Sequence, residues 1–532
     1  MQIKVRINEE GALRNQGYAF TDRFTLISEL LQNARRAGAT QIEVDHDTDT
    51  QVLCVRDDGC GMADFQKLLS FHESGWDAVT CTDERPFGVG FSKCLYAASR
   101  CIVASGLHRV DIDTAAALDQ ALFDVTQIEP AQAIHGTLIE LHGVDLPDLA
   151  ARIDTLCLGF PTAVLFNGKP LQRRLAQAHL PMMPSPIGAV YLTGTQDCKH
   201  NHHTLVFLQG FCVMRPPYWS VDQVNVVHLD SQQFVARLPD RDKLIDEDLQ
   251  RRRIETALKA CWREVLETAK ARMAPERFVE DYYSAMRSWG HLDLLNDIDA
   301  LPRVLCSDIV AYPTQDNSSG VEYLQQVTTA PSRQAIEAGA ATLSALDVLD
   351  DENAALWLFS RAKGHLVIDW LGLHTAHWAQ PLVRFPEREA VAIEVVSEQH
   401  RTELEGRWIW PTVILCDRIR ITVGTESVDI TQSGLHHEGC LYIPEGETSG
   451  EPVRQASSFM DEHDQYLAND MEADRDALAD LICRLRSVDP LQTLDSLLQN
   501  LKLGKYPLLH GKRFALSVGT GPAPSHSLDL LD

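Results

Sequence analysis

The chain contains 532 residues and carries a formal net charge of −27, with 45% hydrophobic and 23% charged residues. This length exceeds what one hydrophobic core usually serves, so we expect about three domains of a soluble globular protein. A strongly acidic surface repels nucleic acid, so DNA binding is possible only through a local basic patch and is not favoured. No apolar run reaches the roughly 18 residues of a membrane span, no signal-peptide core opens the chain, and the 13 cysteines are an odd, scattered set typical of reduced thiols. We therefore expect a cytoplasmic protein with no membrane contact.

The first segment, residues 1–175, alternates helical and strand patterns. Residues 23–38 predict an amphipathic helix, because their apolar side chains recur at helical spacing and Gly38 occupies a C-cap position. A second helix is predicted between the glycines near residue 90 and Arg100. Short strands are predicted at residues 41–45, 51–56, 101–105 and 137–142.

The second and third segments, residues 176–300 and 301–532, are less regular. The second predicts strands at 204–209 and 223–229 and a long helix at 247–272. The third predicts strands at 365–369, 390–396, 412–415 and 418–423, and an acidic stretch at 445–480 that we expect to be partly mobile. A last helix begins with Asp489 as N-cap and Pro490 at its first position, and ends near Gly504. The sequence does not assign a role to this third segment, for which partner binding and dimerisation are the candidates.

Glu29 and Asn33 lie four residues apart in the first predicted helix and therefore project from one face of it. Burying such a pair on an apolar helix costs free energy unless something binds there. A carboxylate can take a proton from water, and an amide oxygen can ligate a hard cation such as Mg²⁺. On its own this spacing is also typical of a surface pair.

The stretch from Asp57 to Met62, with the sequence DDGCGM, follows a predicted strand directly. Its glycines permit a positive φ and close approach of the backbone to a ligand. A carboxylate at the end of a strand can accept a hydrogen bond from an exocyclic amine. The further oxygen ligands of a calcium-binding loop are missing, so we do not expect calcium here.

Glycines open the helix after residue 86, in the sequence PFGVGFS, and such glycines present backbone N–H groups to an anion. Gly136 and Thr137 begin a later strand. The phosphate-loop signature G-x-x-x-x-G-K-[ST] is absent, so bound phosphates would need another backbone cradle.

Together and in this order, these four elements resemble the GHKL ATPase superfamily of Hsp90 chaperones, type II topoisomerases, MutL and histidine kinases. Within it the chain looks most like Hsp90, because DDGCGM is similar to the adenine motif, PFGVGFSKCLYAAS to the glycine motif and ESGW to the lid-entry segment between them. The resemblance covers about residues 17–142 and is absent beyond about residue 300. It implies an α+β chain: a Bergerat α/β sandwich with helices on one face of a mixed sheet, an α/β transducer-like middle domain, and a mixed α+β C-terminal region.

The resemblance implies that ATP and Mg²⁺ are the cofactors and that Glu29 is the general base that polarises the attacking water. Asn33 would ligate Mg²⁺, and Asp57 would accept a hydrogen bond from the adenine amino group. Gly59 and Gly61 would let the chain pass close to the nucleotide.

The resemblance also implies a lid between Met62 and Phe87. The loop of Gly88, Val89 and Gly90 would cradle the phosphates. Thr137 would contact adenine, either directly or through water.

One residue departs from the family pattern. An aspartate that lines the nucleotide pocket usually follows the asparagine by three positions, and here that position is Arg36. A cation there would weaken adenine binding, add a phosphate contact, or turn outward. Nucleotide preference and turnover therefore remain open from the sequence.

In the middle segment, the stretch LPDRDKL is similar to the Hsp90 stretch that supplies a cation to the γ-phosphate. Arg241 would then be the γ-phosphate sensor, with Lys243 as the alternative. Such a cation stabilises charge that builds up during phosphoryl transfer. An exposed ion pair is the ordinary alternative for Arg241.

The function that the resemblance implies is an Hsp90-like ATPase that drives a clamp-like change in a protein partner, with a homodimer possible. A DNA-transaction clamp of the MutL or topoisomerase type is one alternative, although the net charge of −27 argues against it. A module that binds ATP but hydrolyses it negligibly is another. A histidine kinase would need a phosphoacceptor helix pair before the ATP domain. Only a short segment precedes Glu29, so we do not favour this alternative.

Overall fold

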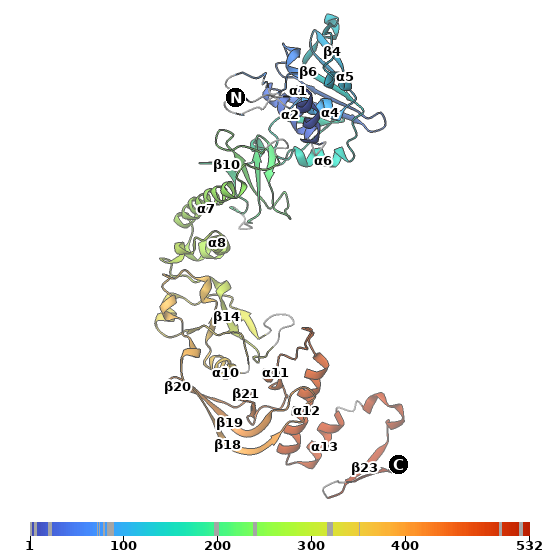
Figure 1. The fold of residues 1–532 in the computed structure, drawn as a ribbon. Helices are drawn as coiled ribbons and strands as arrows, with labels where there is room; N and C mark the ends of the chain where they lie inside the picture. The colour runs from blue at the N-terminus through green and yellow to red at the C-terminus, as the bar shows by residue number, and fades with distance from the viewer. Residues whose placement is uncertain are drawn as a thin grey trace. The chain divides into compact units, whose positions relative to one another are not determined.

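The computed structural model describes most of the chain in two compact units (Figure 1). Unit 1 comprises Met1–Met273 and Ser284–His291, and unit 2 comprises Ala274–Tyr283 and Leu292–Asp532. The described residues are 3–4, 8–19, 24–71, 73, 75–77, 80–81, 84, 90–195, 202–237, 242–315, 323–350, 352–499, 503–520 and 525–531. The three-segment division at residues 175 and 300 stays a prediction.

Unit 1 opens with an eight-stranded mixed sheet of order β5-β4-β3-β6-β2-β1-β7-β8. Its strands are β1 (Gln41–Asp47), β2 (Val52–Asp57), β3 (Arg100–Gly106), β4 (His108–Asp113), β5 (Thr126–Gln127), β6 (Ile134–His142), β7 (Ala163–Phe166) and β8 (Lys169–Pro170). The accompanying helices are α1 (Glu9–Ala19), α2 (Thr25–Arg36), α4 (Ser92–Ala97), α5 (Thr114–Leu118) and α6 (Leu149–Leu156), with a short 3-10 helix η1 (Phe65–Leu68). The chain is thus α+β, with a mixed sheet covered by helices, as expected.

Helix α2 lies against one face of this sheet because its apolar residues recur every three or four positions. The buried members of that stripe are Leu26, Ile27, Leu30, Leu31 and Ala34. They share one core with Val44 and Val55 of the sheet and with Leu95 of α4. Along β2, the buried residues Leu53, Val55 and Asp57 therefore share the face that meets α2, and the residues between them point to the other face.

A second sheet follows within unit 1, in the order β12-β11-β13-β10-β9. Its strands are β9 (Met183–Ser185), β10 (Gly188–Tyr191), β11 (Thr204–Leu208), β12 (Phe211–Met214) and β13 (Asn225–Leu229), and the long helix α7 (Glu247–Arg272) comes after them. The predicted bounds of α7 are confirmed. A two-residue turn at Gln209 and Gly210 joins β11 to β12, and both residues have a positive φ.

Unit 2 contains a four-stranded sheet, β15-β14-β17-β16, and a larger curved sheet, β18-β19-β22-β21, with β20 paired to β19. The strands are β14 (Cys306–Ile309), β15 (Leu324–Gln326), β16 (Leu343–Ser344), β17 (Leu366–Ile368), β18 (Val391–Glu403), β19 (Thr412–Val423), β20 (Glu426–Ile430), β21 (Leu435–His437), β22 (Cys440–Ile443), β23 (Arg513–Val518) and β24 (His526–Leu531). The helices are α9 (Arg333–Glu337), α10 (Ala354–Lys363), α11 (Val453–Ala456), α12 (Ala468–Arg486) and α13 (Pro490–Gln499), and α8 (Pro275–Trp289) belongs in part to each unit.

Two expectations for the third segment were wrong. The separate strands predicted at 412–415 and 418–423 are one continuous strand, β19, which pairs with β18 along its whole length. The acidic stretch at 445–480 holds α11 and most of α12, where Leu478 is fully buried and joins a core with Leu415 of β19.

Candidate nucleotide-binding site

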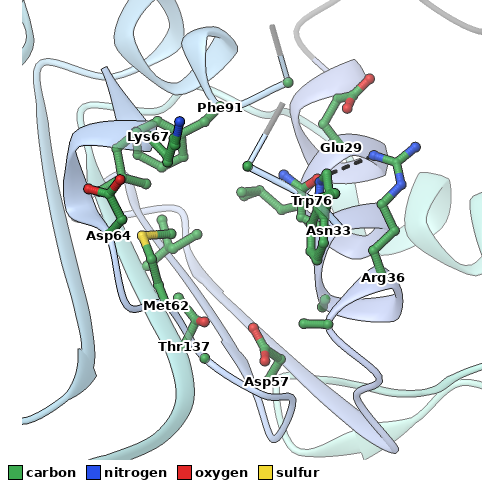
Figure 2. Close-up of a pocket in the computed structure, with 18 of the residues that line it drawn as sticks. Glu29, Asn33, Arg36, Asp57, Met62, Asp64, Lys67, Trp76, Phe91 and Thr137 are labelled. Atoms are coloured by element: carbon green, nitrogen blue, oxygen red, sulfur yellow. Dashed lines mark hydrogen bonds between the residues drawn. The ribbon is translucent and has the colours of Figure 1, made fainter. Parts of the chain in front are cut away.

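A cavity of about 340 Å³ lies between α2, the end of β2 and the start of α4 (Figure 2). Figure 2 shows Glu29 and Asp57 at opposite ends of this cavity. The predicted site residues among its lining are Glu29, Asn33, Asp57, Gly61, Met62, Gly90 and Thr137. Residues separated by more than 100 positions in sequence therefore meet at one site.

The first end of the cavity is formed by α2. Glu29 and Asn33 lie on the same side of the helix and both line the cavity, while the apolar stripe of α2 faces the sheet. The Glu29 side chain is almost completely buried, and the Lys93 ammonium lies 3.7 Å from its Oε1. A buried carboxylate is thus held within reach of a ligand and close to a cation.

Gly90 allows the start of α4 to approach this carboxylate. A Cβ atom at position 90 would lie 2.6 Å from Glu29 Oε2. Such a contact forces either the helix or the carboxylate to move. Gly90 therefore has a steric function here that does not depend on phosphate.

The other end of the cavity is formed by two paired strands. Asp57 of β2 lies directly opposite Thr137 of β6 in the antiparallel register, and both side chains are buried. They occupy the sheet face that carries Val55, which also meets α2. Burial raises the pKa of the Asp57 carboxyl, while backbone hydrogen bonds from Gly59 and Thr137 act in the opposite direction.

The two consecutive aspartates have different environments. Asp57 lines the cavity, whereas Asp58 accepts hydrogen bonds from the backbone N–H groups of Thr40, at 2.7 Å, and Gln41, at 3.0 Å. Asp58 therefore fastens the turn after α2 to the end of β2. Its pKa is lowered, first by the hydrogen bond from the Gln41 backbone.

The glycines after Asp57 meet protein rather than open space. A Cβ atom at Gly59 would lie 2.7 Å from the Ala37 Cβ, so this glycine lets the turn pack against the end of α2. Gly61 has a φ of +72° and lines the cavity. Ser105 supports this loop: its hydroxyl accepts from the Met62 N–H at 2.8 Å and donates to the Gly136 carbonyl at 2.7 Å. No sequence motif indicates Ser105, because a lone serine in a strand carries no signal.

The side of the cavity away from α2 includes Asp64 and Lys67, which no motif indicated. Phe91, from the glycine motif, lies beside Lys67 there, whereas Trp76, from the lid-entry segment, also lines the cavity but lies beside Asn33 of α2 (Figure 2). Lys67 pairs with Glu73 and is partly exposed. The Lys67 ammonium and the rings of Phe91 and Trp76 thus all belong to the lining of the cavity.

Arg36 lines the cavity as well, and its side chain is 2% exposed. Its Nε donates to Glu84 Oε2 at 2.8 Å, and its Nη1 lies 3.5 Å from Asn33 Oδ1 (Figure 2). Arg35 donates to the same Glu84 oxygen. Arg36 thus turns toward the asparagine.

Gly88 and Val89 of the predicted phosphate loop lie outside the described residues, as do Phe87, at the end of the predicted lid, and Arg241. Lys243, the alternative to Arg241, is described. It lines a second cavity of about 750 Å³ in unit 1, and Glu29 lines that cavity too.

Mg²⁺ bound with a nucleotide would need only one or two protein oxygens, because it keeps several waters. The Asn33 amide oxygen fits that requirement by type and by its place on the cavity wall. The Arg36 guanidinium near that same oxygen opposes a second cation there.

A buried acceptor at a strand end and a carboxylate–amide pair on a helix face each other across one cavity under a mixed sheet, an arrangement consistent with the Bergerat fold. Residues 22–140 match the family described as histidine kinase-, DNA gyrase B- and HSP90-like ATPase. The match supports membership of this N-terminal domain in the GHKL superfamily. No curated protein is significantly similar to the chain. Within the described residues, no helix is long and apolar enough to cross a membrane.

Proposed function

We propose that this chain binds ATP in the 340 Å³ cavity and hydrolyses it slowly. The observation that carries the proposal is the placement of Asp57 and Glu29 at opposite ends of one cavity. Asp57, with Thr137 beside it, accepts from the exocyclic amine of adenine. The triphosphate then extends toward Glu29 and Asn33.

Glu29 acts as the base that orients and polarises the attacking water, a role that requires a carboxylate within hydrogen-bond reach of that water. Gly90 keeps the start of α4 clear of this carboxylate. Asn33 would hold Mg²⁺, which when bound neutralises phosphate charge. A cation from the middle segment, Lys243 or Arg241, completes the γ-phosphate end, and Lys243 shares a cavity with Glu29.

The output that we propose is conformational. ATP closes the lid between Met62 and Phe87 and draws the second sheet of unit 1 toward the nucleotide, and hydrolysis resets it. Gln209, in the turn of that sheet, already accepts a hydrogen bond from Gln32 of α2 at 2.6 Å. Such a cycle would act, chaperone-like, on a protein partner in the cytoplasm, and a homodimer would give it the form of a clamp.

The catalytic part is tested by Glu29→Gln, which keeps the side-chain volume but removes the base. We expect ATP binding to remain and phosphate release to fall by about 100-fold or more, the usual scale for loss of a general base. Glu43→Gln, on β1, is the matched control and should keep the wild-type rate. Unchanged phosphate release in Glu29→Gln would remove Glu29 from catalysis.

A module that binds ATP without turnover is the second candidate. It is favoured by Arg36, whose guanidinium lies near the oxygen proposed for Mg²⁺. Equal phosphate release by the wild type, Glu29→Gln and a buffer blank, with ATP bound to both proteins, would establish this candidate instead.

The class of partner is tested by purifying Glu29→Ala from native cells and identifying what is recovered with it. A variant that binds but does not hydrolyse ATP should accumulate in the closed state. We expect an ATP-dependent protein partner. Recovery of nucleic acid alone would instead favour a DNA-transaction clamp.

A further inference from the structure

The Arg36 guanidinium is shared between an anion and a neutral oxygen at the phosphate end of the cavity. Its Nε donates to Glu84 Oε2 at 2.8 Å, and its Nη1 approaches Asn33 Oδ1 at 3.5 Å. Arg35 donates to the same Glu84 oxygen. Two guanidinium groups on α2 thus share one carboxylate, and the three side chains together carry a net charge of about +1.

The cluster of Arg35, Arg36 and Glu84 disfavours a metal ion at Asn33 but can bind a phosphate. A divalent cation at Asn33 Oδ1 would lie close to the Arg36 guanidinium, and like charges at that distance repel. A phosphate oxygen is an acceptor of the same kind as the Glu84 carboxylate, and the planar fork of an arginine suits both. An arriving triphosphate is therefore a direct competitor of Glu84.

We propose that Arg36 binds the nucleotide phosphates directly, exchanging the Glu84 carboxylate for a phosphate oxygen, and so supplies much of the positive charge that Mg²⁺ would supply at Asn33. Nucleotide binding then persists without a divalent cation. The inference rests on the proposed ATP binding and specifies what the site requires of its ligand. Glu84 acts as an internal anion that lowers nucleotide affinity until it is displaced.

The charge state of Glu84 agrees with this role. Burial raises the pKa of its carboxyl, but hydrogen bonds and charge from Arg35 and Arg36 outweigh burial, and the pKa lies below its usual value. Glu84 is therefore anionic at neutral pH and competes with phosphate under physiological conditions. Its side chain is 16% exposed, so it can leave the cluster for water.

The test is the equilibrium dissociation constant for ATP, measured once with Mg²⁺ and once with EDTA. For the wild type we expect the two constants to agree within about threefold. Arg36→Gln should weaken binding in EDTA by at least tenfold and show a strong gain on adding Mg²⁺. Glu84→Gln should bind ATP in EDTA about tenfold more tightly than the wild type, because the competing anion is gone. These magnitudes follow the usual value of a hydrogen bond to a charged group.

Asp111→Asn is the matched control, since it removes a carboxylate from an exposed pair with Arg100 in the same domain. It should leave both constants unchanged. Wild-type binding that requires Mg²⁺ overturns the inference and leaves ATP binding intact. Glu84→Gln binding no tighter than the wild type in EDTA also overturns it, even if Arg36→Gln fails to fold. Absence of binding in both buffers overturns the proposed function as well.

Discussion

The ammonium nitrogen of Lys93 lies 3.7 Å from Oε1 of Glu29, and the two side chains are 3% and 6% exposed. One belongs to the helix after the glycine motif and the other to α2, so the pair joins the two helices that border the cavity. A buried charge that loses its partner costs far more than an exposed one. The pair therefore fixes the position of the proposed catalytic carboxylate.

Lys93→Met should destabilise unit 1 by about 3 kcal/mol, because it leaves the Glu29 carboxylate buried without its cation. Denaturant unfolding measures the loss. The double variant Lys93→Met/Glu29→Leu should recover most of it, since both charges of this buried pair are then removed. Lys67→Met removes a cation from an exposed pair and should cost less than about 1 kcal/mol. Equal losses in Lys93→Met and Lys67→Met would contradict the importance of the buried pair.

Gly90→Ala should reduce turnover more than binding, because the added Cβ would lie 2.6 Å from Glu29 Oε2. Displacing a reacting group by about 1 Å commonly costs on the order of 100-fold in rate. Steady-state phosphate release and equilibrium ATP binding, measured together, separate the two effects. Gly504→Ala is the control, since no atom lies within 4 Å of its Cβ position. Wild-type turnover in Gly90→Ala would show that the carboxylate tolerates the contact.

Asp57→Asn should make unit 1 more stable at neutral pH. Burial raises the folded-state pKa of Asp57 above its ordinary value of 3.8, so folding disfavours the ionised form. The penalty is absent below the ordinary pKa, appears as pH rises through the window between 3.8 and the raised value, and is complete above it. The thermal midpoint of Asp57→Asn should therefore exceed that of the wild type at pH 7, and the difference should shrink toward pH 3.5. A difference independent of pH would contradict this origin.

Gln209 connects the second sheet of unit 1 to the N-terminal domain, in which we propose that ATP binds. Its Oε1 accepts from Gln32 Nε2 at 2.6 Å, and its Nε2 donates to the Glu84 carbonyl at 3.3 Å. Asparagine tolerates the φ of +55° at this position but is one methylene too short for both contacts. In the wild type, ATP binding should protect the backbone amides of residues 204–214 against hydrogen exchange. In Gln209→Asn, ATP should still bind, but this protection should be lost. Retained protection would show that the coupling takes another route.

The sequence predicts well those features that depend on local spacing. The apolar period of α2 and the cap signals around it fix that helix to within two residues at each end, and the long helix α7 has the predicted bounds. The ends of α2 and β2 in turn place Glu29, Asn33 and Asp57. Most of the predicted site residues that the structure describes meet at one cavity for this reason.

Features that depend on distant pairing could not be predicted. In the sequence, nothing distinguishes Lys93 from an exposed helical lysine. Its buried pair with Glu29 forms only because the fold brings α4 against α2. The sequence predicts two strands separated by Cys416 and Asp417, but β19 continues through both residues. Asp417 lies on the exposed side of the strand and accepts a hydrogen bond from Gln399 of β18. In the acidic stretch, Asp474 is buried because it accepts from three backbone N–H groups of residues 407–409, which no charge count reveals.

Equilibrium binding of ATP to the wild type and to Asp57→Asn tests the central claim most directly. A hydrogen bond to a charged acceptor contributes about 1.5–3 kcal/mol, so we expect Asp57→Asn to bind ATP between about 10- and 100-fold more weakly. Asp45→Asn, an exposed aspartate on β1 of the same sheet, should bind like the wild type. Equal affinities of all three proteins for ATP, or no binding by the wild type, would contradict a nucleotide site built on Asp57.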